Sequence, residues 1–226
     1  MEKSKIYLIG DSTCHTNNFD TFPQVGWGQV IGEYIDSNYE VVNLAQNGRS
    51  TKSFIDEGWF KPCEKSIAKG DYLFIQFGHN DEKTDEARHT DPFTTYQENL
   101  LFFVNIARNV GATPVLLSSI YRRHFDENGV IEENCHLDYP KAMEELASKE
   151  DVIYIDMCEL TKQKLVELGV DASKELFMNF DKNIYPNYPE GKEDNTHLRE
   201  KGARMVCELL VKELTKNPIT SKILKK

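Results

Sequence analysis

Short apolar runs alternate along the chain with stretches in which apolar residues recur every three or four positions. Runs rich in β-branched and aromatic residues are typical of buried strands, whereas a period near 3.6 is typical of helices with one apolar face. The short runs predict five strands, at residues 5–9, 41–44, 72–77, 113–118 and 152–156. The other stretches predict helices, among them 92–110, 140–149, 159–169 and a last helix that contains 203–214.

Two of these helices carry the clearest signals. Asp91 and Pro92 suit the N-cap and the first position of a helix, and Gly111 suits its end. The apolar stripe between them comprises Phe93, Tyr96, Leu100, Phe103, Val104 and Ala107. In the last helix the stripe comprises Ala203, Val206, Cys207, Leu210, Val211 and Leu214.

Alternating strands and helices predict an α/β fold, with a parallel sheet covered by helices on both faces as a three-layer α/β/α sandwich. For five strands the flavodoxin-like order 2-1-3-4-5 is the expected one, with ligands bound beyond the carboxyl ends of the strands. Chemistry is therefore expected just after the first three strands. Because no repeat, low-complexity tract or linker interrupts the pattern, residues 1–226 are expected to form a single domain.

The charge balance narrows the range of partners. Among 226 residues, 37 are acidic and 27 are basic, which gives a formal net charge of −10. Binding to nucleic acid requires clustered lysines and arginines, and none occur before the last few residues. We therefore expect no nucleic-acid partner.

Cysteine usage and hydropathy indicate the compartment. The five cysteines are widely spaced, odd in number and form no C-x-x-C pair, which favours free thiols over a disulfide framework or a zinc site. No stretch approaches the roughly 20 apolar residues of a membrane span, and the N-terminus has no apolar core of a secretory signal. A cytoplasmic protein without a membrane partner is the expectation.

Four polar blocks fall where the predicted topology places ligand chemistry. Three follow the first three strands, and one opens the last predicted helix: Gly10-Asp11-Ser12-Thr13, Asn47-Gly48-Arg49-Ser50, Gly78-His79-Asn80-Asp81 and Asp194-Asn195-Thr196-His197. Each block alone is common as a turn or a helix cap. Together they place a serine between two loops that carry hydrogen-bond donors, the arrangement that acyl transfer needs.

These blocks resemble those of the SGNH (GDSL-like) hydrolase family, and the resemblance extends from Ile6 to the last helix. The most similar branch is that of the rhamnogalacturonan acetylesterases. That branch is indicated by Thr13, by the Gly26-Trp27-Gly28-Gln29 run and by the second and third blocks.

The resemblance implies a set of roles. Ser12 would be the nucleophile, His197 its base and Asp194 the carboxylate that orients the imidazole. The backbone N–H groups of Ser12 and Gly48 and the side-chain amide of Asn80 would form the oxyanion hole. Neither a metal nor another cofactor is implied.

Residues for substrate specificity are less sharply marked. Arg49, Arg122 and Arg123 lie in loops at the predicted substrate end, and arginine suits bidentate binding of a sugar carboxylate. Tyr188 lies in a loop of aromatics and prolines, residues 179–193, that could stack on sugar rings. Solvated charges and a ring that pins its own loop explain these residues equally well. A net charge of −10 favours short oligosaccharides over an intact polyanion.

The resemblance thus implies a serine esterase that releases acetate from acetylated plant oligosaccharides. An alternative within the family is a lipase, thioesterase or arylesterase on longer acyl groups, although few apolar residues flank Ser12. A metallophosphoesterase would need Asp-x-His in the first block, where this chain has Asp11-Ser12-Thr13. A non-catalytic carbohydrate-binding module would not need the serine, histidine and aspartate together. The pattern leaves the oligomeric state open.

Overall fold

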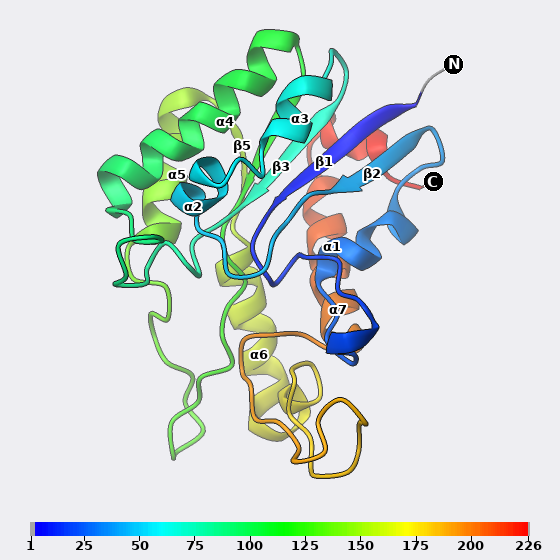
Figure 1. The fold of residues 1–226 in the computed structure, drawn as a ribbon, viewed down its shortest axis with the longest axis vertical. Coiled ribbons are helices and arrows are strands. Elements are labelled where there is room, and N and C mark those ends of the chain that lie inside the picture. The colour runs from blue at the N-terminus through cyan, green and yellow to red at the C-terminus, as the bar shows by residue number, and fades with distance from the viewer. Residues whose placement is uncertain (1–2, 226) are drawn as a thin grey trace.

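The computed structural model describes residues 3–225 and contains a five-stranded parallel sheet in the order β2-β1-β3-β4-β5 (Figure 1). The strands are β1 (Ser4–Gly10), β2 (Tyr39–Asn43), β3 (Tyr72–Gln76), β4 (Thr113–Leu117) and β5 (Ile153–Ile155). All neighbouring strands pair in parallel. The predicted fold class and strand order are confirmed, and each strand lies within two residues of its predicted limits.

Helices cover both faces of the sheet. They are α1 (Trp27–Val30), α2 (Thr51–Asp56), α3 (Lys61–Ser66), α4 (Gln97–Val110), α5 (Tyr139–Glu150), α6 (Met157–Lys174) and α7 (Glu200–Leu214). One hydrophobic core joins the sheet to α1, α6 and α7, and a second joins it to α2 through α5. Alternate residues of one strand serve the two cores: Ile6 and Leu8 face one, Tyr7 and Ile9 the other.

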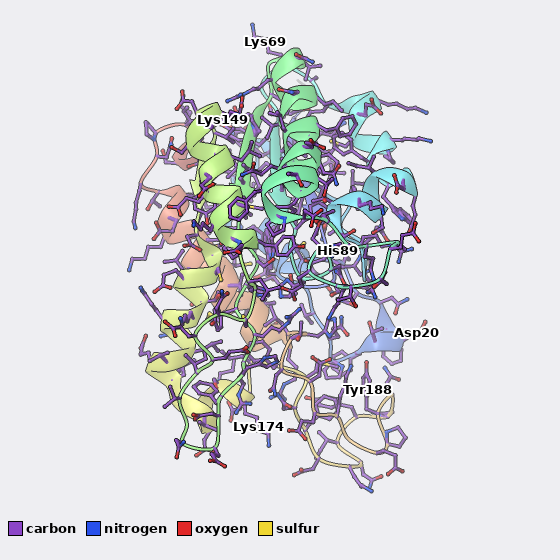
Figure 2. All side chains as sticks on the ribbon, turned by 90° about the vertical axis from the view of Figure 1, so that its left-hand side faces the viewer. Asp20, Lys69, His89, Lys149, Lys174 and Tyr188 are labelled. Carbon is purple, nitrogen blue, oxygen red and sulfur yellow. The ribbon has the colours of Figure 1, made fainter. Side chains whose placement is uncertain are left out.

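The two ends of the sheet differ in their surroundings. Lys69 and Lys149, which precede β3 and β5, lie at one end of the molecule in Figure 2. Asp20 and Tyr188 lie at the other end, in long loops. The carboxyl ends of the strands thus face the loop-rich half of the molecule. Among residues 3–225 no helix is both long and apolar enough to cross a bilayer.

Two helix predictions need correction, at Pro92 and at the start of the last helix. The helix expected from Pro92 begins with a π-helical turn, Pro92–Tyr96, and this wider turn leaves Phe93 off the apolar stripe and 42% exposed. The predicted helix end at Gly169 is confirmed, because the backbone there is non-helical, at φ 71°, ψ −176°, and the rest of α6, to Lys174, is a second helical segment. The last helix begins at Glu200, so the fourth polar block lies in the loop before α7 rather than in its first turn.

Candidate active site

Ser12 follows the central strand of the sheet. Strand β1 pairs with β2 on one side and β3 on the other, so the loops that follow these strands flank the loop that carries Ser12. The close fit of this turn depends on Gly10, where an added Cβ would lie 2.5 Å from the backbone oxygen of Gln76 and from Sγ of Cys14. A side chain at position 10 would therefore push Ser12 out of its place.

The loop before α7 brings a histidine and a carboxylate to this serine. Nε2 of His197 lies 2.9 Å from Oγ of Ser12, and Nδ1 of His197 lies 2.8 Å from Oδ2 of Asp194. Because Nδ1 faces a carboxylate, it carries the ring proton, and Nε2 accepts from the serine hydroxyl. The arrangement is a continuous chain of hydrogen bonds from serine through imidazole to carboxylate.

The carboxylate of Asp194 is held in its ionised form. Burial by itself raises the pKa of Asp194, but hydrogen bonds from the ring and backbone of His197 and from the backbone of Thr196 bring the pKa well below its usual range. Oδ1 receives both backbone N–H groups, at 2.9 Å each, which leaves Oδ2 for the imidazole. At neutral pH this side chain can therefore stabilise a positive charge on His197.

Two residues that the motifs do not mark hold this loop. The backbone N–H of Arg123 donates to the carbonyl of Asn195 at 2.9 Å, and its guanidinium donates to the Asn195 side chain at 2.9 Å. Asn179 donates to the same side-chain oxygen at 3.0 Å and accepts from the backbone N–H of Asp194 at 3.1 Å. These contacts join positions far apart in the chain, so no local pattern could have indicated them.

Gly48 and Asn80 approach the site from the two flanking loops. Gly48 has φ +75° and no heavy atom within 4 Å of an added Cβ, so its backbone stays open to a ligand. The side-chain amide of Asn80 donates one hydrogen bond to the carbonyl of Arg49 at 3.1 Å, which fixes its orientation. An amide nitrogen has a second N–H, and this one remains to be offered to a ligand.

Beneath the serine loop lies a buried polar contact. Oδ1 of Asp11 accepts hydrogen bonds from the backbone N–H and hydroxyl of Thr13, at 2.9 and 2.8 Å, and its other oxygen lies 3.3 Å from Nδ1 of His79. Burial lowers the pKa of His79 to about 4, so this ring is neutral at physiological pH. Asp11 and His79 therefore shape the loops that carry Ser12 and Asn80 rather than exchange protons with solvent.

Sequence comparison agrees with this geometry. The model of the GDSL-like Lipase/Acylhydrolase family matches residues 8–205, which include all four polar blocks. The chain belongs to this family. Membership of this family identifies the protein as a carboxylic ester hydrolase.

Several relatives of this acylhydrolase carry the name rhamnogalacturonan acetylesterase. Rhamnogalacturonan acetylesterase RhgT of Bacillus subtilis is 45% identical over 206 residues, which cover 91% of this chain and 87% of RhgT. The probable rhamnogalacturonan acetylesterase YesY of the same organism is 37% identical, with 97% of each chain covered. Rhamnogalacturonan acetylesterase of Emericella nidulans is 28% identical over 92% of this chain and 83% of the relative.

Solved structures show the same fold as this acylhydrolase. YxiM of Bacillus subtilis superposes with a TM-score of 0.80 at 25% identity, over 95% of this chain and 56% of YxiM, so the chain spans about half of that protein. Axe2, an acetylxylan esterase from Geobacillus stearothermophilus, superposes with a TM-score of 0.65 at 15% identity, over 94% of this chain and 95% of Axe2.

The arginines considered for substrate binding in this acylhydrolase all have intramolecular partners. The Arg49 guanidinium lies 2.7 Å from Oε2 of Glu57 and keeps 34% of its side chain exposed. Arg122 forms a largely buried ion pair with Glu82. Arg123, described above, holds the loop of Asp194 and His197. Of the three, only Arg49 presents an exposed side chain beside the site.

Tyr188 of this acylhydrolase packs within its own loop. Its ring lies 5.6 Å from that of Phe180, the ammonium of Lys192 lies 5.0 Å from its centroid, and its hydroxyl donates to the carbonyl of Thr21 at 3.4 Å. The ring thus serves to fix the loop. Among residues 3–225, no group of three or more histidines, cysteines and carboxylates is arranged to hold a metal ion.

Proposed function

We propose that this protein is a carbohydrate O-acetylesterase that releases acetate from acetylated pectic oligosaccharides through Ser12, His197 and Asp194. The observation that carries the proposal is the hydrogen-bond chain among these three side chains, at 2.9 and 2.8 Å. The names of the 45% and 37% identical relatives support the substrate class. A net charge of −10 favours short oligosaccharides over an intact polyanion as substrates. Five free cysteines favour a reducing compartment.

In the proposed reaction the Ser12 hydroxyl attacks the acetyl carbonyl while Nε2 of His197 takes its proton. Asp194 stabilises the imidazolium that results. The oxyanion would accept hydrogen bonds from the backbone N–H groups of Ser12 and Gly48 and from the free amide N–H of Asn80. When the ester bond breaks, the sugar oxygen takes the proton from His197 and leaves as an alcohol, and the acetyl group stays on Ser12.

Water completes the cycle. His197 takes a proton from a water molecule, which attacks the acetyl-serine, and the same proton returns to Oγ of Ser12 as acetic acid departs and ionises to acetate in solvent. Groups of this chain carry every proton, so the proposed reaction requires no cofactor. These groups interact with charge that develops in the transition state, at the carbonyl oxygen and on the imidazole. Interactions that are stronger in the transition state than in the ground state lower the barrier.

The decisive experiment measures acetate release from acetylated pectic and xylan oligosaccharides with a chelator present throughout. Ser12→Ala should lower kcat by on the order of 10³-fold or more, because the nucleophile is lost while binding remains. Ser37→Ala is the matched control, since Ser37 is an exposed serine before β2, at the opposite end of the sheet. Equal rates for wild type and Ser12→Ala would refute the serine mechanism, and activity only on octanoyl esters would refute the acetyl-sugar substrate.

A further inference from the structure

Two phenylalanines stand out on the surface near the active site. Phe19 is 81% exposed and Phe22 is 48% exposed, and their rings stack with centroids 6.4 Å apart and planes 9° from parallel. They belong to the loop that connects Ser12 to α1. Neighbouring exposed aromatic rings cost free energy in water and commonly mark a binding surface.

This loop is firmly held although its rings are exposed. The side-chain amide of Asn187 donates to the carbonyls of Phe19 and Phe22, at 2.7 and 3.1 Å. The side chain of Asn18 caps the short helical turn by accepting from the backbone N–H of Asp20 at 2.9 Å. The two rings are thus presented on an ordered backbone, as a preorganised platform requires.

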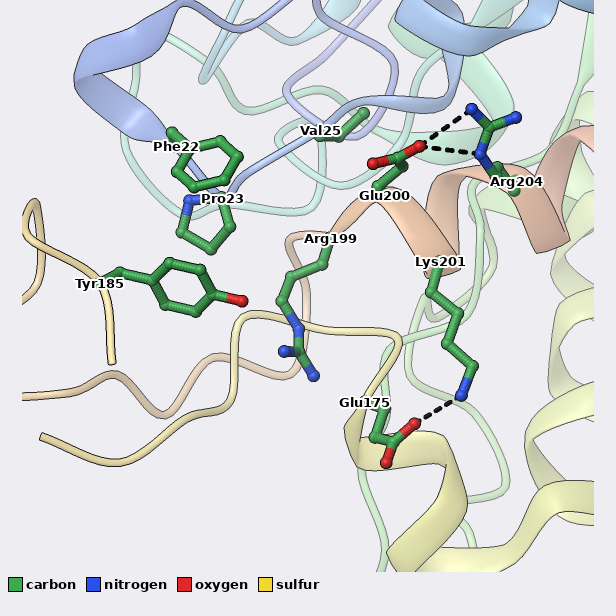
Figure 3. A pocket seen from close by; sticks show the side chains of 9 residues that line it. All are labelled: Phe22, Pro23, Val25, Glu175, Tyr185, Arg199, Glu200, Lys201 and Arg204. Atoms are coloured by element: carbon green, nitrogen blue, oxygen red, sulfur yellow. Dashed lines mark hydrogen bonds and ion pairs between the residues drawn. The ribbon is translucent and has the colours of Figure 1, made fainter. Parts of the chain in front are cut away.

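A groove of about 550 Å³ begins beside Phe22 (Figure 3). Phe22, Pro23 and Tyr185 line one side of it, and the Tyr185 ring meets Phe22 edge to face at 5.7 Å. Arg199 and Lys201 line the other side, and Figure 3 shows the hydroxyl of Tyr185 directed toward the side chain of Arg199. Glu175 and Glu200 also line the groove, so it pairs an aromatic wall with one that carries charges of both signs.

Among the described residues that line the groove, Arg199 is the cation without an ion-pair partner. Lys201 is paired with Glu175 at 2.5 Å, and Arg204 is paired with two glutamates of its own. Arg199 donates only from Nε, to the carbonyl of Phe177 at 2.8 Å, and no carboxylate among residues 3–225 lies within ion-pair distance of it. Its two terminal nitrogens are free for an anion, and guanidinium binds carboxylates in a bidentate manner.

The groove is joined directly to the proposed catalytic loop. Arg199 follows His197 by two residues, so their Cα atoms lie at most about 7 Å apart. The backbone N–H of Val25 donates to the carbonyl of Leu198 at 2.9 Å, and Gln24 forms an isolated antiparallel β-bridge with Arg199. Sugar units held in the groove would therefore lie beside the loop that carries His197.

We propose that this groove binds a uronate unit of the oligosaccharide, adjacent to the acetylated sugar at Ser12. The carboxylate pairs with Arg199, and the apolar C–H faces of the sugar rings pack on Phe19 and Phe22. Charge complementarity favours an acidic sugar, because a free guanidinium on a chain of net charge −10 is a local site of positive potential. The inference rests on the proposed acetylesterase function and adds to it the place where the acidic unit binds.

Kinetics with a charged and a neutral substrate test the role of Arg199. Arg199→Gln keeps a donor for the Phe177 carbonyl but removes the charge. It should lower kcat/KM on acetylated oligogalacturonides at least tenfold more than on acetylated xylo-oligosaccharides, mainly through KM. Arg108→Gln is the control, because Arg108 also donates to backbone carbonyls, but at the end of α4 where the strands begin. An equal loss on both substrates, or none, overturns the proposal.

Phe19 provides a second variant with little risk of misfolding. Phe19→Ala should raise KM for oligosaccharides severalfold more than KM for p-nitrophenyl acetate, which has no sugar ring. Phe102→Ala, which removes a 41% exposed ring on α4, should show no such preference. Equal effects of the two substitutions on the KM ratio would contradict an aromatic platform.

Direct binding separates this inference from the proposed function. Unacetylated oligogalacturonide is titrated calorimetrically into Ser12→Ala protein with and without Arg199→Gln. The Kd should rise at least tenfold when Arg199→Gln is added to Ser12→Ala. In the Ser12→Ala protein itself, the Kd should rise with increasing salt concentration. Such binding, together with a wild type that releases no acetate, would refute the acetylesterase function and leave the site intact. No binding, or binding that Arg199→Gln does not weaken, refutes the site.

Discussion

The carboxylate of Asp81 accepts hydrogen bonds from both the backbone N–H and the hydroxyl of Thr51, at 3.0 and 2.5 Å. Asp81 follows Asn80 directly, and Thr51 lies three residues after Gly48. The contact therefore joins the two loops that would supply the oxyanion donors. Its geometry fixes the distance between a backbone N–H and a side-chain amide that must act on one oxygen atom.

Asp81 should make stability depend on pH. Burial raises the pKa of Asp81 to about 7, above about 3.9 in the unfolded chain, so folding takes up a proton between these values. The resulting stabilisation is complete below about pH 4 and is lost as the pH rises through about 7. From pH 5 to 8 the free energy of unfolding of the wild type should fall by on the order of 2 kcal/mol more than that of Asp81→Asn.

Urea unfolding of both proteins at pH 5, 6, 7 and 8 provides the measurement. The comparison with Asp81→Asn removes the contributions of all other titrating groups. Parallel pH dependences of the two proteins would mean that Asp81 remains ionised in the folded state.

Asp194→Asn should separate catalysis from folding. An asparagine retains the oxygen that accepts from the backbone N–H groups of Thr196 and His197, so the loop should keep its place. The charge that stabilises the imidazolium is lost, and an amide can favour the wrong tautomer of His197. We expect kcat to fall by about 10⁴-fold, the size of the loss for the equivalent change in a serine triad.

A double mutant tests whether the three side chains act together. Adding Asp194→Asn to Ser12→Ala should cause little further loss of kcat, since the carboxylate acts only through the histidine and serine. Thermal unfolding of each variant serves as the folding control. Multiplied losses in the double mutant would show that Asp194 acts independently of Ser12.

The strands and the positions of the polar blocks could be predicted because both depend on local pattern. A parallel sheet places the carboxyl ends of its strands at one edge, so Ser12 and Asn80 had to end near each other once the strand order was known. The helix beginning at Pro92 shows the limit of this reasoning. Its N-terminal signals are present, but the π-helical turn that displaces Phe93 depends on tertiary packing.

The partners of charged side chains could not be predicted. Arg122 meets Glu82 across 40 positions, and Arg123 meets Asn195 across 72. From the sequence alone these arginines are indistinguishable from free surface cations. The same limit hid Arg199, which has no carboxylate within ion-pair distance among residues 3–225, a property of the folded surface alone.

Gly48 offers a final test, because a matched glycine exists elsewhere in the chain. Gly48 and Gly169 have φ of +75° and +71°, and an added Cβ would meet no heavy atom within 4 Å at either position. Alanine in such a conformation is strained, so each substitution should lower the free energy of unfolding by about 1–3 kcal/mol. Urea unfolding measures this common cost.

Only one of the two substitutions should affect catalysis. Relief of strain at Gly48→Ala rotates the peptide whose N–H is assigned to the oxyanion, and loss of one such donor lowers kcat by about 10²- to 10³-fold. The break in α6 at Gly169 is not among the loops that flank Ser12, so kcat of Gly169→Ala should stay near that of the wild type. If both variants lose stability equally and kcat of Gly48→Ala is also retained, the oxyanion is held by Ser12 and Asn80 without the Gly48 N–H.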